Sequence, residues 1–116
     1  MAEAFANRYG SDVLVAGSRG LAPAQVVPSD TIATMASKGI DVSKHFSRKY
    51  DPIEGNLQDI VVNMSGYNLP GFQPPDLRVW KIDDPYLRSS VVYAKVRDEI
   101  ENQVMRLILE LRKAQK

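Results

Sequence analysis

The sequence predicts an α/β fold in a single domain spanning residues 1–116, and three observations lead to this prediction. Short apolar runs alternate with segments of helical periodicity, as they do where a parallel sheet carries helices on its faces. The chain has 116 residues, the size of one domain. Hydrophobic residues make up 44% of the chain and charged residues 25%, the ordinary profile of a globular protein.

Three runs in the sequence predict strands. Residues 12–16 form a short apolar run bounded by Gly-Ser pairs, and residues 59–64 form a second one rich in β-branched residues. We interpret both as buried strands. Residues 77–82 alternate apolar and polar side chains, which indicates a strand nearer the edge of the sheet.

Four segments predict helical structure. Residues 2–9 read as a short helix that ends at Gly10 as its C′ residue. Ser29 or Asp30 is expected to cap a second helix that runs to about residue 38, and residues 51–55 predict a turn or a single helical turn. A long helix from Ser89 or Ser90 to about Ala114 carries an apolar stripe, predicted to be core: Val92, Val96, Ile100, Val104, Ile108 and Leu111. Its polar side offers i, i+4 ion pairs at Lys95/Glu99, Arg97/Glu101 and Arg106/Glu110.

Composition excludes several classes of function. The formal net charge of +1 gives no general attraction to nucleic acid, and no apolar run approaches the roughly 18 residues of a membrane span. The first residues lack a basic segment followed by a long apolar stretch, so we expect no signal peptide and a cytoplasmic location. The absence of cysteine excludes disulfides, thiolate metal sites and a cysteine nucleophile in this polypeptide. The single histidine, His45, cannot form a metal site alone, and the sequence calls for no cofactor.

The order of several short motifs resembles one known family. These motifs are Met1-Ala2-Glu3-Ala4, Val15-Ala16-Gly17-Ser18, Gly39-Ile40-Asp41-Val42-Ser43 with His45, Asp59-Ile60-Val61-Val62-Asn63-Met64, and Trp80-Lys81-Ile82-Asp83-Asp84-Pro85. Together they resemble the low-molecular-weight protein-tyrosine phosphatase and arsenate reductase superfamily over nearly the whole chain. The resemblance implies a flavodoxin-like parallel sheet. It also implies an N-terminally incomplete domain, because the family's first strand and its Cys-x5-Arg phosphate loop have no counterpart here.

The resemblance also implies roles for individual residues. Asp84 matches the family's general acid, which protonates the leaving oxygen. Tyr86 matches a residue near the substrate entrance, and His45 a residue that supports the phosphate loop. The alternatives are a simple turn residue for Asp84, since Asp-Pro commonly starts turns, and a structural hydrogen-bonding role for His45.

Other side chains have plainer interpretations. Asp83 is interpreted as a solvated loop charge. Trp80 is expected to cover core, and Tyr67 to lie at the rim of a groove.

Without a cysteine nucleophile we expect this chain to be inactive as a phosphatase, and to act on a phosphotyrosine-type substrate only if the missing loop is restored. One hypothesis is therefore a polypeptide whose start was assigned too late. Another is a natural non-catalytic binding or regulatory module. A third is an arsenate reductase relative, favoured by Trp80 and the Asp83–Pro85 loop but opposed by Ser65, which stands where thioredoxin-linked reductases carry a redox cysteine. Exposed strand edges further predict a homodimer or a domain-swapped assembly.

Overall fold

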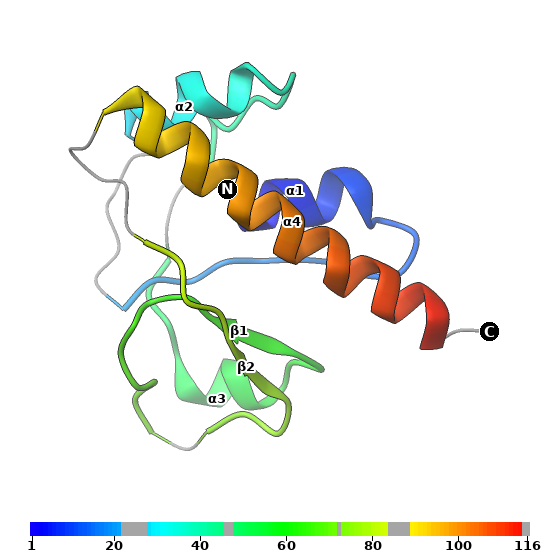
Figure 1. Ribbon diagram of the computed structural model, residues 1–116. Coiled ribbons are helices and arrows are strands. Elements are labelled where there is room, and N and C mark those ends of the chain that lie inside the picture. The colour runs from blue at the N-terminus through cyan, green and yellow to red at the C-terminus, as the bar shows by residue number, and fades with distance from the viewer. Residues whose placement is uncertain (22–27, 46–47, 72, 84–88, 115–116) are drawn as a thin grey trace.

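The chain folds as an α/β protein with a parallel sheet, as the sequence predicts. The computed structural model describes residues 1–21, 28–45, 48–71, 73–83 and 89–114. Helices α1 (Ala2–Tyr9), α2 (Ser29–Ala36) and α4 (Ser90–Ala114) lie together in one part of the molecule. The other part contains α3 (Pro52–Asn56) and strands β1 (Val61–Asn63) and β2 (Leu77–Val79) (Figure 1). We call these the helical part and the strand part.

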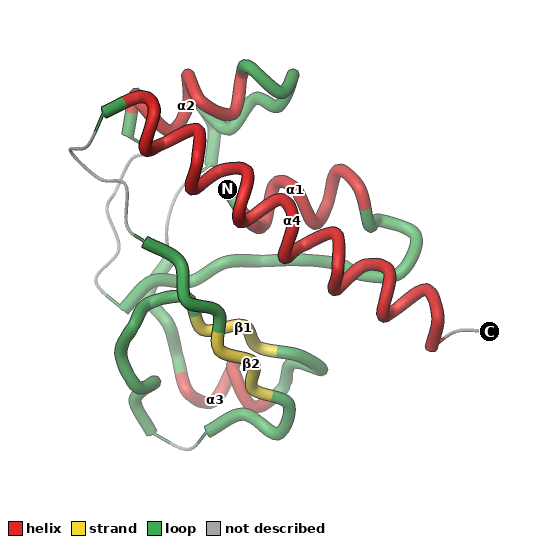
Figure 2. Tube along the Cα trace, viewed as in Figure 1, coloured by secondary structure: helices red, strands yellow, loops and turns green. Residues whose placement is uncertain are grey.

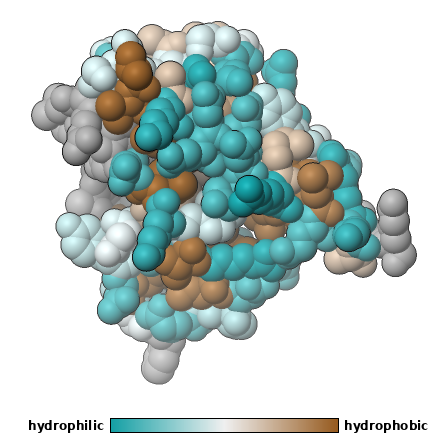
Figure 3. Space-filling view, viewed as in Figure 1, coloured by the Kyte–Doolittle hydropathy of each residue, from teal (hydrophilic) through white to brown (hydrophobic). Residues whose placement is uncertain are grey.

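Helix α4 organises the core, because it packs against both α1 and α2. The apolar stripe predicted from its sequence is confirmed: Val96, Ile100, Val104 and Ile108 are buried in the main hydrophobic cluster. The helices contribute Ala4, Phe5 and Ala6 from α1 and Met35 from α2, and Ile40 and Val42 complete the cluster. Hydrophilic residues cover most of the face in which α4 lies, and hydrophobic residues appear there as separate patches (Figure 3).

The sheet described by the structure has two strands. β1 and β2 are parallel, with Val61 opposite Leu77 and Asn63 opposite Val79. Figure 2 shows both strands, in yellow, on the far side of the molecule from α2. The predicted strands 59–64 and 77–82 are thus present, but each is shorter than its sequence pattern indicates.

The predicted buried strand at residues 12–16 is wrong. Residues 11–13 form a turn, in which the Val13 and Leu14 amides donate to the Gly10 carbonyl, and residues 14–19 have no regular structure. Val15 is 98% exposed. The amide and the carbonyl of Ala16 are both bonded to the Asn7 side chain, at 2.9 and 3.0 Å. The Asn7 side chain of α1 therefore bonds the backbone groups of Ala16 that a neighbouring strand would otherwise bond.

The helices begin and end close to the predicted residues, but two residues predicted to cap them, Ser29 and Gly10, do not act as predicted. Ser29 lies inside α2, and the N-cap position is Pro28, which provides no side-chain hydrogen bond. Gly10 ends α1 with a φ of −123°, outside the left-handed region expected of a C′ glycine. Glycine is favoured at position 10 for a steric reason instead, because a Cβ there would lie 2.7 Å from Cγ1 of Ile108. Gly39, in contrast, does adopt a positive φ of 73° after α2.

The charged side chains of α4 reach other elements rather than following the predicted i, i+4 pattern. Glu101 accepts a hydrogen bond from Tyr9 of α1 at 3.0 Å and pairs with Lys38, after α2, at 3.2 Å. Arg78 of β2 pairs with Glu110 at 2.6 Å, and Arg112 donates two hydrogen bonds to Asp12. These contacts join α4 to α1, to the turn after α1, to the segment after α2 and to β2. Within the described residues, no helix is both long enough and apolar enough to span a membrane.

Candidate functional site

A hollow lies where the two strands end and α1 begins. Its volume is about 540 Å³. Met64 and Ser65, directly after β1, line it together with Ile82 and Asp83, from the segment after β2. Met1, at the start of α1, lines it as well. In parallel α/β folds, ligands bind in the crevice beyond the carboxyl ends of the strands, and this hollow occupies that position.

The amino-terminal end of α1 gives one wall of the hollow its electrostatic character. Unpaired backbone N–H groups and the helix dipole make such an end favourable for negative charge. Glu3, in the first turn of α1, already places a carboxylate there. Burial lowers the pKa of the Met1 α-amino group below its usual value, and the Glu3 charge partly opposes that shift.

His45 lies beside the first turn of α1. Its Nδ1 is 3.6 Å from Oε2 of Glu3, and the Ser18 hydroxyl donates to the same oxygen at 3.1 Å. The His45 amide donates to the carbonyl of Val42, which is buried in the core. His45 thus joins the segment after α2 to the start of α1. Its predicted supporting role remains a prediction, and these contacts are compatible with both interpretations.

Ser65 closes a hydrogen-bonded turn after β1. Its hydroxyl lies 2.6 Å from Oδ1 of Asn63 and 3.1 Å from the Tyr67 carbonyl, both of which can accept its proton. The same hydroxyl accepts the Tyr67 amide at 3.1 Å, and the buried Asn63 side chain donates to the Tyr67 carbonyl at 2.7 Å. The hydrogen bonds of the Ser65 hydroxyl are therefore all made within the turn, and His45 is not among its partners.

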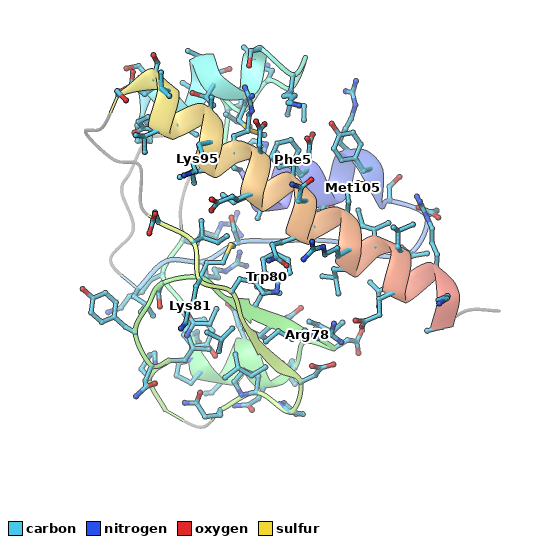
Figure 4. The ribbon with its side chains drawn as sticks, in the orientation of Figure 1. Phe5, Arg78, Trp80, Lys81, Lys95 and Met105 are labelled. Carbon is cyan, nitrogen blue, oxygen red and sulfur yellow. The ribbon has the colours of Figure 1, made fainter. Side chains whose placement is uncertain are left out.

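Two of the three predicted site residues, Asp84 and Tyr86, lie outside the described residues. Asp83 is described: it is exposed, as a solvated loop charge should be, and it also lines the hollow. Trp80 is half-buried and packs against the hydrophobic cluster, so its assignment to the core is confirmed. Figure 4 shows Trp80 in the space between the sheet and α4. Tyr67 is 76% exposed.

Sequence reasoning overlooked two residues that shape this region. The Glu3 carboxylate contacts both Ser18 and His45. In the sequence, only its place in the Met1–Ala4 motif indicated that Glu3 belongs to this region. Asn63 is the one buried polar residue recorded in the described chain. An asparagine inside an apolar, β-branched run is a signal of such a role, because a buried amide needs partners.

The chemistry open to the site is limited by its side chains. The sequence contains no cysteine, so no thiolate can attack an ester or reduce a substrate. Over the described ranges, no group of three or more His, Asp or Glu side chains is placed to hold a metal ion. The site does offer the amino terminus of α1, the Ser65 hydroxyl held by hydrogen bonds within its turn, the exposed Asp83 carboxylate and an apolar wall.

The fold and the position of this hollow are those of a flavodoxin-like α/β protein. Residues 1–116 match the family described as low molecular weight phosphotyrosine protein phosphatase, and the chain belongs to that family.

Its relatives carry two kinds of activity in their names. The chain is 29% identical to the glutaredoxin arsenate reductase of Synechocystis sp., over 96% of this chain and 87% of that one. A solved structure described as an arsenate reductase in the reduced state superposes with a TM-score of 0.82 at 29% identity, over 95% of this chain and 86% of that one. The low molecular weight protein tyrosine phosphatase of T. tengcongensis gives a TM-score of 0.80 at 21% identity, over 95% and 88%, and shows the shared fold.

Proposed function

We propose that this polypeptide alone is a non-catalytic member of the low molecular weight phosphatase family and acts as a binding module. One observation carries the proposal: among the residues that the structure describes, the site where the strands end holds no nucleophile that could replace a thiolate. Cysteine is absent from all 116 residues. The hydroxyl of Ser65, which lines the hollow, is held by Asn63 and Tyr67, and His45 is engaged with Glu3.

The magnitude of the missing contribution supports inactivity. General-acid catalysis contributes about 10²- to 10⁴-fold, but only once a nucleophile attacks and a preorganised site stabilises the developing charge. The proposed acid Asp84 therefore has no reaction to assist in this chain.

The direct test is an activity assay of the purified chain with p-nitrophenyl phosphate, and separately with arsenate plus glutathione and glutaredoxin. We expect no turnover above the protein-free blank in either assay. A Ser65→Ala variant, purified in the same way, controls for contaminating phosphatase. Turnover that is present in the wild-type chain and lost in this variant would contradict the proposal, because it would make Ser65 a nucleophile.

Arsenate reduction is the second candidate function, and a specific observation supports it. Relatives named as arsenate reductases share 29–31% identity with the chain over 78–96% of its length. If the arsenate assay gave turnover and the phosphate assay gave none, the chain would be a reductase that uses a chemistry other than a protein thiolate.

Asp84 and Tyr86 enter the proposal as latent site residues. A polypeptide extended before Met1 by an apolar strand and a Cys-x5-Arg loop should hydrolyse p-nitrophenyl phosphate. In that background, Asp84→Asn should lower kcat by about 10²-fold or more, because the leaving oxygen loses its proton donor. Asp83→Asn is the matched control and should leave kcat within about threefold. Equal losses in the two variants would contradict the assignment of the acid to Asp84.

A further inference from the structure

Helix α3 carries an apolar ridge on its outer side. Ile53 and Leu57, four residues apart along this helical turn, lie on one face and are 74% and 78% exposed. The other side of α3 is closed, because Gly55 is buried and a Cβ there would lie 2.7 Å from Cζ of Tyr50. Isolated exposed apolar residues need no explanation, whereas adjoining ones indicate a contact surface. We call Ile53 and Leu57 the α3 ridge.

Acidic residues border the α3 ridge. Asp51, directly before α3, and Asp59, shortly after Leu57, are exposed, and no ion pair is recorded for either within the described residues. Glu54 is exposed as well, although it pairs with Arg19 at 3.5 Å. Charges of opposite sign select one another across an interface, and like charges repel. A partner that covers the ridge should therefore be apolar at its centre and basic on both sides.

The outer face of α4 has this complementary character. Arg106, Leu109 and Lys113 are three and four residues apart, so they lie on one face of the helix, and all three are exposed. The two cations stand on either side of Leu109, two helical turns or about 10 Å apart along the axis. Among the described residues no ion pair is recorded for either cation, because Glu110, at helical spacing from Arg106, pairs with Arg78 instead. We call these three residues the basic face of α4.

The two surfaces do not meet within one molecule. Helix α3 lies in the strand part and the basic face of α4 in the helical part (Figure 1). Leu57 and Leu109 both remain exposed in the single chain, so neither surface covers the other. Both surfaces are outer sides of helices, separate from the edges of the sheet and from the hollow. A contact between them therefore requires two molecules.

We propose that the α3 ridge of one molecule docks on the basic face of α4 of a second copy of this chain. Leu109 packs against Ile53 and Leu57, and the flanking cations lie near the carboxylates that border the ridge. The contact joins unlike surfaces, so the copies associate head to tail. The self-association expected from the sequence then uses helix faces instead of strand edges.

The proposed contact is small, and this sets its expected strength. Three apolar side chains are few for a permanent interface, so association should be weak and dependent on concentration, with a Kd of about 10⁻⁴ M or weaker. This inference stands apart from the proposed function, because it requires neither activity nor inactivity of the site.

Sedimentation equilibrium of the purified chain is the first test. In low-salt buffer, the average mass should rise above that of the monomer as the concentration increases to about 1 mM, well above the expected Kd. Added salt should weaken the association, because it screens the charges on both surfaces. A chain that stays monomeric at the highest concentration would overturn the proposal.

Single variants test each surface separately. Leu57→Gln removes half of the α3 ridge, and Leu109→Gln removes the apolar centre of the basic face of α4. Each should weaken self-association by about tenfold or more, because apolar burial is lost while the charges remain. Val91→Gln is the matched control, since Val91 is an exposed apolar residue of α4 outside both surfaces. An equal loss of association in the control would reduce the interaction to general apolar adhesion and overturn the proposal.

A mixture of the two leucine variants tests whether the surfaces bind each other. Leu57→Gln keeps an intact basic face of α4, and Leu109→Gln keeps an intact α3 ridge. The mixture should therefore form a one-to-one complex with about the affinity of one wild-type contact, although each variant alone associates poorly. A mixture no heavier than the separate variants would overturn the proposal, because the two surfaces would then not recognise one another.

Charge variants repeat the comparison without changing an apolar side chain, so the test holds even if a leucine variant fails to fold. Asp59→Asn and Lys113→Gln should each weaken self-association at low salt, and the difference from the wild-type chain should shrink at high salt. Association that is unchanged in both variants at low salt would contradict the proposed pairing of charges.

Discussion

The helical part and the strand part of this molecule bury their side chains to very different extents. Phe5 of α1 and Ile108 of α4 are completely closed to solvent. In the strand part, Leu57 beside α3 is 78% exposed and Val79 of β2 is 65% exposed. The helices cover one another, whereas Leu57 and Val79 remain open to solvent. Stability should therefore be concentrated in the helical part.

The largest expected effect comes from the centre of the helical part. Ile108→Ala should lower the free energy of unfolding by about 2–5 kcal/mol, because it removes buried methyl groups and leaves a cavity. Leu109→Ala, one residue further along and 57% exposed, is the matched control and should change it by about 0.5 kcal/mol or less. Urea unfolding measures both. Equal losses would contradict the assignment of the core face of α4.

The contact between the end of α1 and α4 can be tested by adding a single carbon. Gly10→Ala should cost about 1–3 kcal/mol, because the new Cβ would lie 2.7 Å from Ile108 and the core would have to shift. Gly17→Ala meets only Arg19, at 3.6 Å, and should be nearly neutral. If Gly10→Ala were as stable as the wild-type chain, the close packing of α1 on α4 would be wrong.

The helical elements were largely predictable from sequence, because their signals are local. The period of the α4 stripe and the lengths of α1 and α4 needed no knowledge of distant residues. The partners of Glu101 and Glu110 were not predictable in this way. Tyr9, Lys38 and Arg78 are brought to them only by the tertiary fold.

The strand part was less predictable, because a strand exists only with a partner. Residues 12–16 have the composition of a buried strand, yet Ala16 bonds to Asn7 and Val15 faces solvent. The site shows the same limit. His45 was singled out by resemblance, but its neighbour Glu3 became evident only when the fold placed it at 3.6 Å.

In the strand part, Ser65→Ala should cost about 1 kcal/mol, because the turn after β1 loses the hydroxyl bonded to Asn63 and Tyr67. Ser65→Cys should also create no phosphatase activity, since a group at this position is directed into the turn. Unfolding curves and a p-nitrophenyl phosphate assay measure the two outcomes. A Ser65→Cys variant that hydrolyses the ester would show that a side chain at this position can leave the turn and attack a substrate in the hollow.

An effect of similar size is expected from the contacts of Glu101 with α1 and with Lys38. Glu101→Ala should cost about 1 kcal/mol, because one partly buried carboxylate is bonded to Tyr9 and paired with Lys38. Glu99→Ala, at an exposed position of the same helix, should be close to neutral. A double-mutant cycle with Tyr9→Phe measures the coupling, and additive effects would contradict it.

The smallest effect is a pH dependence at Asp12. Hydrogen bonds from Arg112 hold the pKa of the Asp12 carboxyl below its usual value. A pKa that is lower in the folded chain favours folding above the unfolded pKa of about 3.9, and this contribution is lost as the pH falls through the folded pKa. Asp12→Asn should therefore reduce stability more at pH 7 than at pH 2. A loss of equal size at both pH values would show that the charge has no part in it.

Native-state hydrogen exchange followed by NMR tests the contrast between the two parts most directly. Amides of α4 such as Ile100 and Val104 should exchange only through global unfolding. The amides of β1 and β2, that of Val62 among them, should exchange through local opening at a lower free energy. Protection of the Val62 amide equal to that of Ile100 and Val104 would contradict this contrast, because it would show a strand part as firmly closed as the helical part.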